Sequence, residues 1–514
     1  MSLSKTLIRN ALSNYTGFVV TAIIGLFISP IVIHHLGNVG FGIWALFQSF
    51  FGYFGLLDLG LGISVVKFIS EFKAKDEQVN VDIFGSTLFF TYIVLGLVGM
   101  LVAFGLAPFV TKIFTIPIGF RRIALDGMVI GGINVAIIFP MSLQINSLAG
   151  NQRYDLTNGI AITRQIIYAI SVILLLKHGF GLLELFWLNF ILSILTFLIS
   201  FSFVALKYKF IHFHLKLYSF GMLRKAYKYS LFAFLNSLAG QGLLNIGSIV
   251  IGTVLSVEFV TYYALANKIA GIIQQAISSI TGISLPTFSA LWAVNDKKRI
   301  RSIYSEIVKA VLLISLPISM VVILFSEPIM QIWVGNGYHL AALTLILLTI
   351  TLFINNIFGF ITGIFLFGIG KPKPVSIADS IAAVANIVLA IGLTKLIEMK
   401  FGHGYGVLGI PIALGISLGT LDFFFLPWYV NRIIELSNRQ YLKIFIKPLL
   451  LIIPTTILAL LIRHYYFPHK LIVFVLESAA IGIFYWGLYY LFGLTKDEKT
   501  RYLGYIKQFR FKNG

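Results

Sequence analysis

The chain has 514 residues, of which 58% are hydrophobic and only 11% are charged, and its formal net charge is +20. A soluble protein of this length needs far more charge to cover its surface, so the composition indicates a polytopic membrane protein. The basic excess lies between apolar blocks, which favours a membrane topology over a nucleic-acid partner. The sequence contains no cysteine, which excludes disulfides, thiol catalysis and cysteine metal sites.

The first apolar block follows Lys5 and Arg9 and is too long for a signal sequence, so we expect a retained transmembrane helix. Along the chain we predict about fourteen transmembrane helices, each long enough to cross ~30 Å of hydrocarbon. The predicted spans lie near residues 11–35, 43–69, 83–106, 123–148, 156–176, 182–206, 228–254, 259–286, 305–326, 340–366, 375–396, 405–428, 445–463 and 471–493.

Lys and Arg are concentrated in alternate connections between these spans. Because cytoplasmic loops carry the excess of basic residues, this pattern predicts that both termini are cytoplasmic. The longest connection, residues 207–228, is basic and aromatic, and we expect an amphipathic segment at the cytoplasmic membrane surface.

Three short phrases recur six predicted spans later, and such a repeat indicates duplicated halves. A unit with an even number of spans keeps its orientation, so a pseudo-two-fold axis along the membrane normal is expected. Transporters built in this way bind their substrate near the midplane and alternate access to it. The paired phrases are HGFGLL at 178–183 with HGYGVL at 403–408, LAGNQRYD at 148–155 with LFGIGKPKP at 366–374, and LGNVGFGIWAL at 36–46 with LSVEFVTYYAL at 255–265.

The predicted fold is therefore an all-α polytopic membrane protein with two six-helix lobes and two C-terminal helices. Residues 1–226 form the N-lobe, with spans 1–6 and the amphipathic connection. Residues 227–430 form the C-lobe, with spans 7–12. Residues 431–514 contain spans 13–14 and a basic cytoplasmic tail.

Lys268 is the most informative polar residue within a predicted span. It lies about ten residues into span 8, which is ~15 Å along a helix and close to the bilayer centre. A charge at this depth costs several kcal/mol, so its presence indicates a function. We favour a cation that lines a cavity over a structural ion pair. Asn267, Gln274 and Gln275 make the surrounding helix polar.

Spans 1 and 7 carry further polar side chains, several of them one helical turn apart and therefore on one face. They either line a substrate cavity or form hydrogen bonds between helices. These residues are Arg9, Asn10, Asn14, Asn236, Gln241 and Asn245.

Asp58 lies in mid-span among Gly55, Gly60 and Gly62, which predicts a broken or kinked helix with an acid at the break. Such an acid either binds a coupling cation or satisfies backbone groups that the bend frees, and we favour the second role. Arg164 lies about eight residues into span 5, where it either lines a cavity or extends toward the cytoplasmic surface.

No cofactor or metal site is expected. The phrase GIGKPKP does not match a phosphate loop, because that pattern needs glycine at Phe365 and serine or threonine at Pro372. All nine histidines lie at span ends or in loops. The driving force is therefore an ion gradient, the membrane potential or consumption of the product.

The stretches FGLLDLGLGISVVKFISEFKAKD, SLAGNQRYDLTN and GIGKPKPVSIADSIAAVANIVLAIGLTK resemble polysaccharide transporters of the Wzx type, which are O-antigen and related oligosaccharide flippases of the MOP superfamily. The resemblance covers spans 1–12. It implies a transporter, not an enzyme, that moves undecaprenyl-pyrophosphate-linked glycans to the outer leaflet of the bacterial cytoplasmic (inner) membrane. Alternating access through a central cationic cavity is the implied mechanism. The implied partners are this glycan, membrane lipids, and the polymerase and chain-length machinery.

A related branch that flips lipid II carries a Tyr-x-x-Ala-Asp-Arg-Leu-like stretch in span 8, whose arginine is functional. Its counterpart here resembles residues 263–269, with Asn267 in place of the aspartate and Lys268 in place of the arginine. The cation is kept, but lysine lacks the bidentate geometry for phosphate. The internal repeat places Gln48 in the first lobe where Asn267 stands in the second.

Three other functions are weighed against a flippase. An ion-coupled multidrug exporter of the same superfamily would need an acidic cavity for organic cations. An intramembrane polymerase or acyltransferase would need a large external loop or buried histidines. An uncoupled lipid scramblase would need no coupling group at all.

Overall fold

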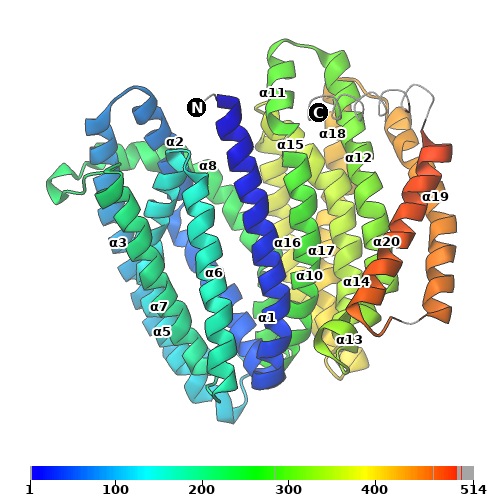
Figure 1. The fold of residues 1–514 in the computed structure, drawn as a ribbon, viewed down its shortest axis with the longest axis horizontal. Coiled ribbons are helices and arrows are strands. Elements are labelled where there is room, and N and C mark those ends of the chain that lie inside the picture. Colours follow the sequence, from blue (N-terminus) through cyan, green and yellow to red (C-terminus); the bar gives the residue numbers. More distant parts are fainter. Residues whose placement is uncertain (1–2, 283, 467, 495–498, 500–514) are drawn as a thin grey trace. The chain divides into compact units, whose positions relative to one another are not determined.

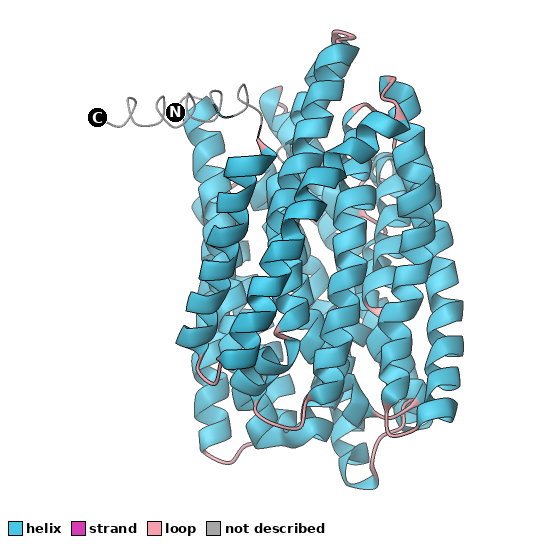
Figure 2. Cartoon of the chain, turned by 90° about the vertical axis from the view of Figure 1, so that its right-hand side faces the viewer, coloured by secondary structure: helices cyan, strands magenta, loops and turns pink. Residues whose placement is uncertain are grey.

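The computed structural model describes residues 3–282, 284–466, 468–494 and 499. The side chains of residues 3–12, 232, 233, 235, 236, 244, 279 and 280 lie outside this description. The described residues form helices joined by short loops, with no strand among them (Figures 1 and 2). Packing divides the chain into two units. Unit 1 comprises Met1–Ala264 with Ala390–Val407, and unit 2 comprises Leu265–Leu389 with Leu408–Gly514.

Helices α10 (Val257–Gly282) and α16 (Lys373–Phe401) contribute residues to both units. The predicted lobe and tail boundaries stay a prediction. The other helices of unit 1 are α1 (Leu3–Phe54), α2 (Leu61–Ala74), α3 (Gln78–Leu106), α4 (Val110–Ile113), α5 (Arg121–Gly150), α6 (Tyr154–Lys177), α7 (Leu182–Phe201), α8 (Phe220–Leu244) and α9 (Ile246–Val254). Those of unit 2 are α11 (Ser284–Ala293), α12 (Lys297–Leu324), α13 (Ser326–Val334), α14 (His339–Ile354), α15 (Ile361–Gly368), α17 (Gly409–Gly419), α18 (Leu426–Ile434), α19 (Asn438–Tyr465) and α20 (Leu471–Leu488).

Within the described residues, 11 helices are long and apolar enough to cross a membrane, or up to 12 if one bent pair is a single span. The chain is therefore a multi-pass membrane protein, as predicted, whereas the count of fourteen is not confirmed. One cause of the difference is α1, where Ser13–Asp58 counts as one candidate. This segment contains a break at Gly37, whose φ of 67° and ψ of 178° are not helical. Without a break, the 52 residues of α1 would extend ~78 Å, far more than one crossing needs.

Predicted span 2 is interrupted at the acid that the sequence singled out. A 3₁₀ turn, η1 (Gly55–Asp58), separates α1 from α2. Leu59 and Gly60 then adopt left-handed conformations, with φ of 52° and 76°. This confirms the prediction of a broken helix with an acid at the break.

The phrase HGFGLL and its later copy share a glycine in the left-handed conformation. Gly179 has φ +82° and Gly404 has φ +81°, a conformation that glycine adopts without strain. In each copy the next glycine donates its N–H to a glutamate: Gly181 to Glu184 Oε2 at 2.8 Å, and Gly406 to Glu398 Oε2 at 3.0 Å. The repeat therefore specifies a glycine turn whose amide is held by a carboxylate.

The repeated segments 36–46 and 255–265 contact each other through residues of unit 1. Thr261 Oγ1 donates to the Asn38 carbonyl at 2.6 Å. A Cβ on Gly42 would lie 1.9 Å from the Val257 carbonyl oxygen, so only glycine fits there. In the alignment of the repeat, Asn38 corresponds to Val257 and Gly42 to Thr261. Each residue thus contacts the counterpart of the other, which is the pattern expected beside a two-fold axis.

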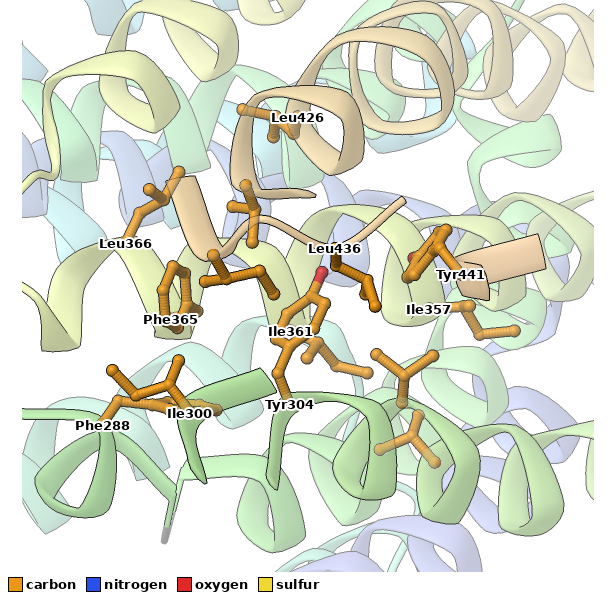
Figure 3. Packing of buried hydrophobic residues seen from close by; sticks show 14 of the residues in the cluster. Phe288, Ile300, Tyr304, Ile357, Ile361, Phe365, Leu366, Leu426, Leu436 and Tyr441 are labelled. Atoms are coloured by element: carbon orange, nitrogen blue, oxygen red, sulfur yellow. The ribbon is translucent and has the colours of Figure 1, made fainter. Parts of the chain in front are cut away.

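The core of unit 2 is centred on Tyr304, which Figure 3 shows between Phe365 and Tyr441. Its ring centroid lies 5.6 Å from that of Phe365 and 6.3 Å from that of Tyr441. The Tyr304 hydroxyl lies 3.2 Å from Thr362 Oγ1, which satisfies a polar atom in a fully buried position. In unit 1, Phe68 packs on Phe84 with centroids 5.3 Å apart.

The connection 207–228, which we expect at the membrane surface, packs on α3 through its middle part. The His212 backbone N–H donates to Asp82 Oδ1 at 2.9 Å, and the His212 ring lies 2.9 Å from Asp82 Oδ2. The Phe213 ring lies 4.7 Å from that of Phe89. These contacts hold the connection against α3, and its place at the membrane surface stays a prediction.

Candidate functional site

Two predicted amides come together at the C-terminal end of α8, where Asn245 is the capping residue. Asn245 Nδ2 donates to Gln241 Oε1, and both side chains are half-buried. The Tyr53 hydroxyl of α1 donates to the Gln241 carbonyl at 2.9 Å. The i, i+4 spacing therefore predicts this pair correctly, and the pair also meets the second half of α1.

Gln48 lies on the same side of α1 as this pair. It is exposed, and Gly52 follows it one turn later on the same face. A Cβ on Gly52 would lie 3.8 Å from Gln241 Oε1. Together, Gln48, Gln241 and Asn245 form a polar strip of amides in unit 1.

Asn14 is held by a partner that the sequence did not indicate. Asn158 Nδ2 of α6 donates to Asn14 Oδ1 at 2.6 Å and to the Tyr154 carbonyl at 2.8 Å. This bond joins α1 to α6, as expected for an amide that links helices. The side chains of Arg9, Asn10 and Asn236 lie outside the described residues.

Both oxygens of Asp58 accept hydrogen bonds. Oδ2 accepts from the Gly62 backbone N–H at 3.1 Å, and Oδ1 accepts from the Tyr92 hydroxyl at 2.5 Å. The Gly62 amide is one that the break in the helix leaves without an intrahelical partner. Of the two roles predicted for Asp58, these contacts favour the one that satisfies the bend.

Arg164 lies ten residues after the start of α6, ~15 Å along the helix. Its Nη2 donates to Asn189 Oδ1 of α7 at 3.1 Å. Its Nε is buried with no hydrogen-bond partner among the described residues. The side chain lines a mostly apolar cavity of about 320 Å³ between α6 and α7. Arg164 thus lines a cavity between these two helices, whereas its place in a substrate cavity stays a prediction.

The predicted residues of α10, Asn267, Lys268 and Gln274, belong to unit 2. Lys268 lies eleven residues after Val257, ~17 Å along the helix, and is half-buried. Gly271 and Gln275 follow on the same face, and both are exposed. A Cβ on Gly271 would meet no atom within 4 Å, so this face of α10 borders open space.

Asn267 and Gln274 are half-buried beside this face. Gln274 Oε1 is buried and has no hydrogen-bond partner among the described residues. Buried polar atoms normally have a partner, so this amide oxygen is open to a donor from outside the described residues.

A buried carboxylate in unit 2 escaped the sequence-based selection. Asp422 is only 2% exposed, and its Oδ2 accepts a hydrogen bond from Asn355 Nδ2 at 2.7 Å. A Cβ on Gly359 would lie 2.4 Å from Asp422 Oδ2, so glycine makes room for the acid. Both sides of the contact are π-helical, in η6 (Asn355–Phe360) and η8 (Thr420–Phe425), and such segments are frequent at functional sites. The sequence does contain a signal for this site, because Asp422 is an acid inside predicted span 12, just as Asp58 is inside predicted span 2.

The profile of a family described as "Polysaccharide biosynthesis protein" matches residues 36–343. A protein from Haloferax volcanii that is named a probable low-salt glycan biosynthesis flippase is 23% identical to this chain, over 75% of each chain. An O-antigen transporter by name, from Shigella flexneri, is 21% identical over 83% of this chain and 98% of its own.

Two solved structures share the fold. The lipid II flippase MurJ in an inward closed conformation has a TM-score of 0.70 at 17% identity, covering 94% of this chain and 99% of its own. An inward-facing multidrug resistance MATE family transporter of the MOP superfamily has a TM-score of 0.69 at 16% identity, covering 82% of this chain and 95% of its own. The predicted membrane transporter fold is therefore confirmed.

Proposed function

This chain belongs to the polysaccharide biosynthesis protein family, and on this basis we propose that it is a flippase for lipid-linked oligosaccharides. The substrate is a glycan on undecaprenyl diphosphate, which crosses from the inner to the outer leaflet of the bacterial cytoplasmic membrane. Both termini then lie in the cytoplasm. The names of the relatives from Haloferax volcanii and Shigella flexneri support this assignment.

The observation that carries the proposal is Lys268 in the middle of α10. Moving a bare diphosphate through hydrocarbon is prohibitive, because ions are very costly to transfer out of water. A cation ~17 Å along the helix, on a face that borders open space, supplies a counter-charge where the cost is greatest. Asn267 and the open oxygen of Gln274 offer hydrogen bonds beside it.

The amides of unit 1 supply a second kind of contact. Gln48, Gln241 and Asn245 present donors and acceptors of the type that bind sugar hydroxyls. In this proposal Arg164 and Arg9 add positive charge, although the side chain of Arg9 lies outside the described residues. In this proposal the glycan moves through an alternating-access pathway while the polyprenyl chain stays in lipid. A membrane potential negative inside opposes return of the anion. The polymerase and chain-length machinery would receive the product.

A second candidate function is ion-coupled export of organic cations. It is favoured by the buried carboxylate of Asp422, an acid in a span of the kind that an exporter needs for coupling. The likeness to a multidrug transporter of known structure shows the fold alone and is compatible with both functions. An uncoupled scramblase is the third candidate.

The test is flipping of a labelled undecaprenyl diphosphate oligosaccharide in proteoliposomes, for the parent, Lys268→Ala and Lys268→Arg. We expect Lys268→Ala to lose activity and Lys268→Arg to keep it, because arginine restores the cation. Lys298→Ala is the control, since Lys298 is an exposed cation of the same unit.

Full activity of Lys268→Ala would remove Lys268 from the pathway. Ion-coupled efflux of organic cations by the parent, with no glycan flipping, would establish the exporter instead. A flipping rate that changes neither with an imposed ion gradient nor with the membrane potential would establish the scramblase.

A further inference from the structure

A basic cavity lies at the start of α8, apart from the predicted site residues. Its volume is about 770 Å³. Most of its lining comes from one face of α8, and Leu59 closes it at the break after η1. All of these residues belong to unit 1. The lining residues are Leu59, Gly221, Arg224, Lys225, Tyr227, Lys228, Leu231 and Phe234.

The helical spacing separates charge from apolar surface along this cavity. Arg224 and Lys228 lie one turn apart, so their Cβ atoms are about 5–6 Å from each other. They lie ~6 and ~12 Å from the start of α8. Leu231 and Phe234 lie farther along the helix, at ~16 and ~21 Å. The cavity is thus cationic at the end near the start of α8, which we call its mouth, and apolar at the other end.

The cationic groups at the mouth are available to a ligand. Arg224 and Lys228 are exposed, and neither forms an ion pair or hydrogen bond with any part of the chain that the structure describes. Lys225 is instead oriented by aromatic rings, with Nζ 4.8 Å from the centroid of Phe68 and 5.0 Å from that of Phe72. Two free cations and one positioned cation therefore converge on one cavity.

The charged side chains around the cavity are mostly basic, with Glu71 and Asp58 as the nearby acids. Lys67 Nζ lies 3.8 Å from the Tyr229 ring centroid, on the next helix face. The pKa of the nearby Glu71 carboxyl is lowered, first by its hydrogen bond from Lys75 and to a smaller degree by Lys225 and Lys67. A positive region of this kind attracts anions and concentrates them at its mouth.

We infer that this cavity is a loading site for the diphosphate of the lipid-linked substrate, which it binds before transport. Arg224 offers planar guanidinium donors and Lys228 a point charge, so together they can contact both phosphates. Leu231 and Phe234 cover the first isoprene units of the chain. The inference rests on the proposed function and adds a site separate from Lys268.

The experiment measures binding, not transport. The full chain is placed in nanodiscs of phosphatidylcholine and titrated with undecaprenyl diphosphate without a glycan. We expect Arg224→Gln/Lys228→Gln to raise Kd by about tenfold or more, because two charge-assisted contacts are lost. The swapped variant Arg224→Lys/Lys228→Arg keeps the charge and should bind within about threefold of the parent, which shows that the site tolerates substitution.

The matched control is Lys207→Gln/Lys216→Gln. These two exposed lysines lie in the connection before α8 and do not line the cavity. Their substitution removes the same amount of positive charge as the cavity variant. Kd should be unchanged in this control. An equal loss of affinity in both double variants would show that net charge alone causes the effect. An unchanged affinity in Arg224→Gln/Lys228→Gln would show that this cavity does not bind the diphosphate. Either result overturns the inference.

A titration with phosphatidylglycerol separates the two sources of a lipid phosphate. Loss of phosphatidylglycerol binding in Arg224→Gln/Lys228→Gln, with undecaprenyl diphosphate binding intact, would assign the cavity to bulk anionic lipid and overturn the inference. If the parent flips the full substrate but the cavity variant binds as the parent does, only this inference fails. If the parent neither binds undecaprenyl diphosphate nor flips, the proposed function fails as well.

Discussion

The hydroxyl of Ser70 donates a hydrogen bond to the carbonyl oxygen of Gly150 at 2.5 Å, and Ser289 repeats this bond to Gly368 at 2.6 Å. Gly150 and Gly368 are paired glycines of the sequence repeat, and each ends its helix, α5 or α15. The serines were not recognised as a pair in the sequence. The shared bond shows that the two halves repeat a tertiary contact as well as a short phrase.

We predict that Ser70→Ala and Ser289→Ala destabilise the protein by similar amounts, about 1 kcal/mol each, because each removes one hydrogen bond to a helix end. The free energy of unfolding is measured by SDS titration in mixed micelles. Ser380→Ala is the control, since the Ser380 hydroxyl bonds only within its own helix. A loss in one variant and none in the other would contradict equivalent roles.

Gly359→Ala should be destabilising because the new Cβ would lie 2.4 Å from Asp422 Oδ2. The acid would have to move away from Asn355, so we expect a loss of about 1–3 kcal/mol in the same titration. Gly271→Ala is the matched control, because its Cβ would meet no atom within 4 Å and alanine favours a helix. Equal stability of the two variants would mean that Asp422 is not held as the structure shows.

Hydropathy and helical spacing predicted the features that depend on local sequence. The membrane class, the break at Asp58 and the Gln241–Asn245 pair all follow from residues within a few turns of each other. Glycines beside Asp58 allow the left-handed residues of the bend, and i, i+4 spacing places two amides on one face. These expectations agree with the structure because no distant partner decides them.

Contacts between helices could not be predicted in this way. Asn14 bonds to Asn158, and Arg164 bonds to Asn189. In each pair the partner lies on another helix, and one sequence does not specify which helical faces meet. The basic cavity of α8 was missed for a related reason, since Leu59 closes it only through the turn after η1.

Tyr92→Phe tests the role of Asp58. Tyr92 is fully buried, and its hydroxyl donates to Asp58 Oδ1. Removal of this donor leaves an acceptor with one partner fewer in a buried position, so we expect a loss of about 1–3 kcal/mol in the free energy of unfolding. The control is Tyr15→Phe, because Tyr15 is 46% exposed. Unchanged stability of Tyr92→Phe would favour an Asp58 that is free for a coupling cation.

Glu435 gives a pH dependence in the loop after α18. Lys297 Nζ lies 2.7 Å from Glu435 Oε1, and Arg301 Nη2 lies 3.7 Å from Oε2. The pKa of the Glu435 carboxyl is lowered, first by the hydrogen bond and charge of Lys297 and then by the charge of Arg301. A carboxyl whose folded pKa is depressed adds stability above its unfolded pKa, about 4.3, and loses it as the pH falls through the folded value.

Glu435→Gln should therefore lower the thermal unfolding midpoint relative to the parent at pH 6. The difference should shrink as the pH falls below about 4, where the parent's carboxyl also becomes neutral. Raising the salt concentration at pH 6 should reduce it as well, because the pair is exposed and screened. The control is Glu258→Gln, since Glu258 is exposed and forms no ion pair with the residues that the structure describes. A difference that stays constant from pH 6 to pH 3 would show that Glu435 acts through packing and not through its charge.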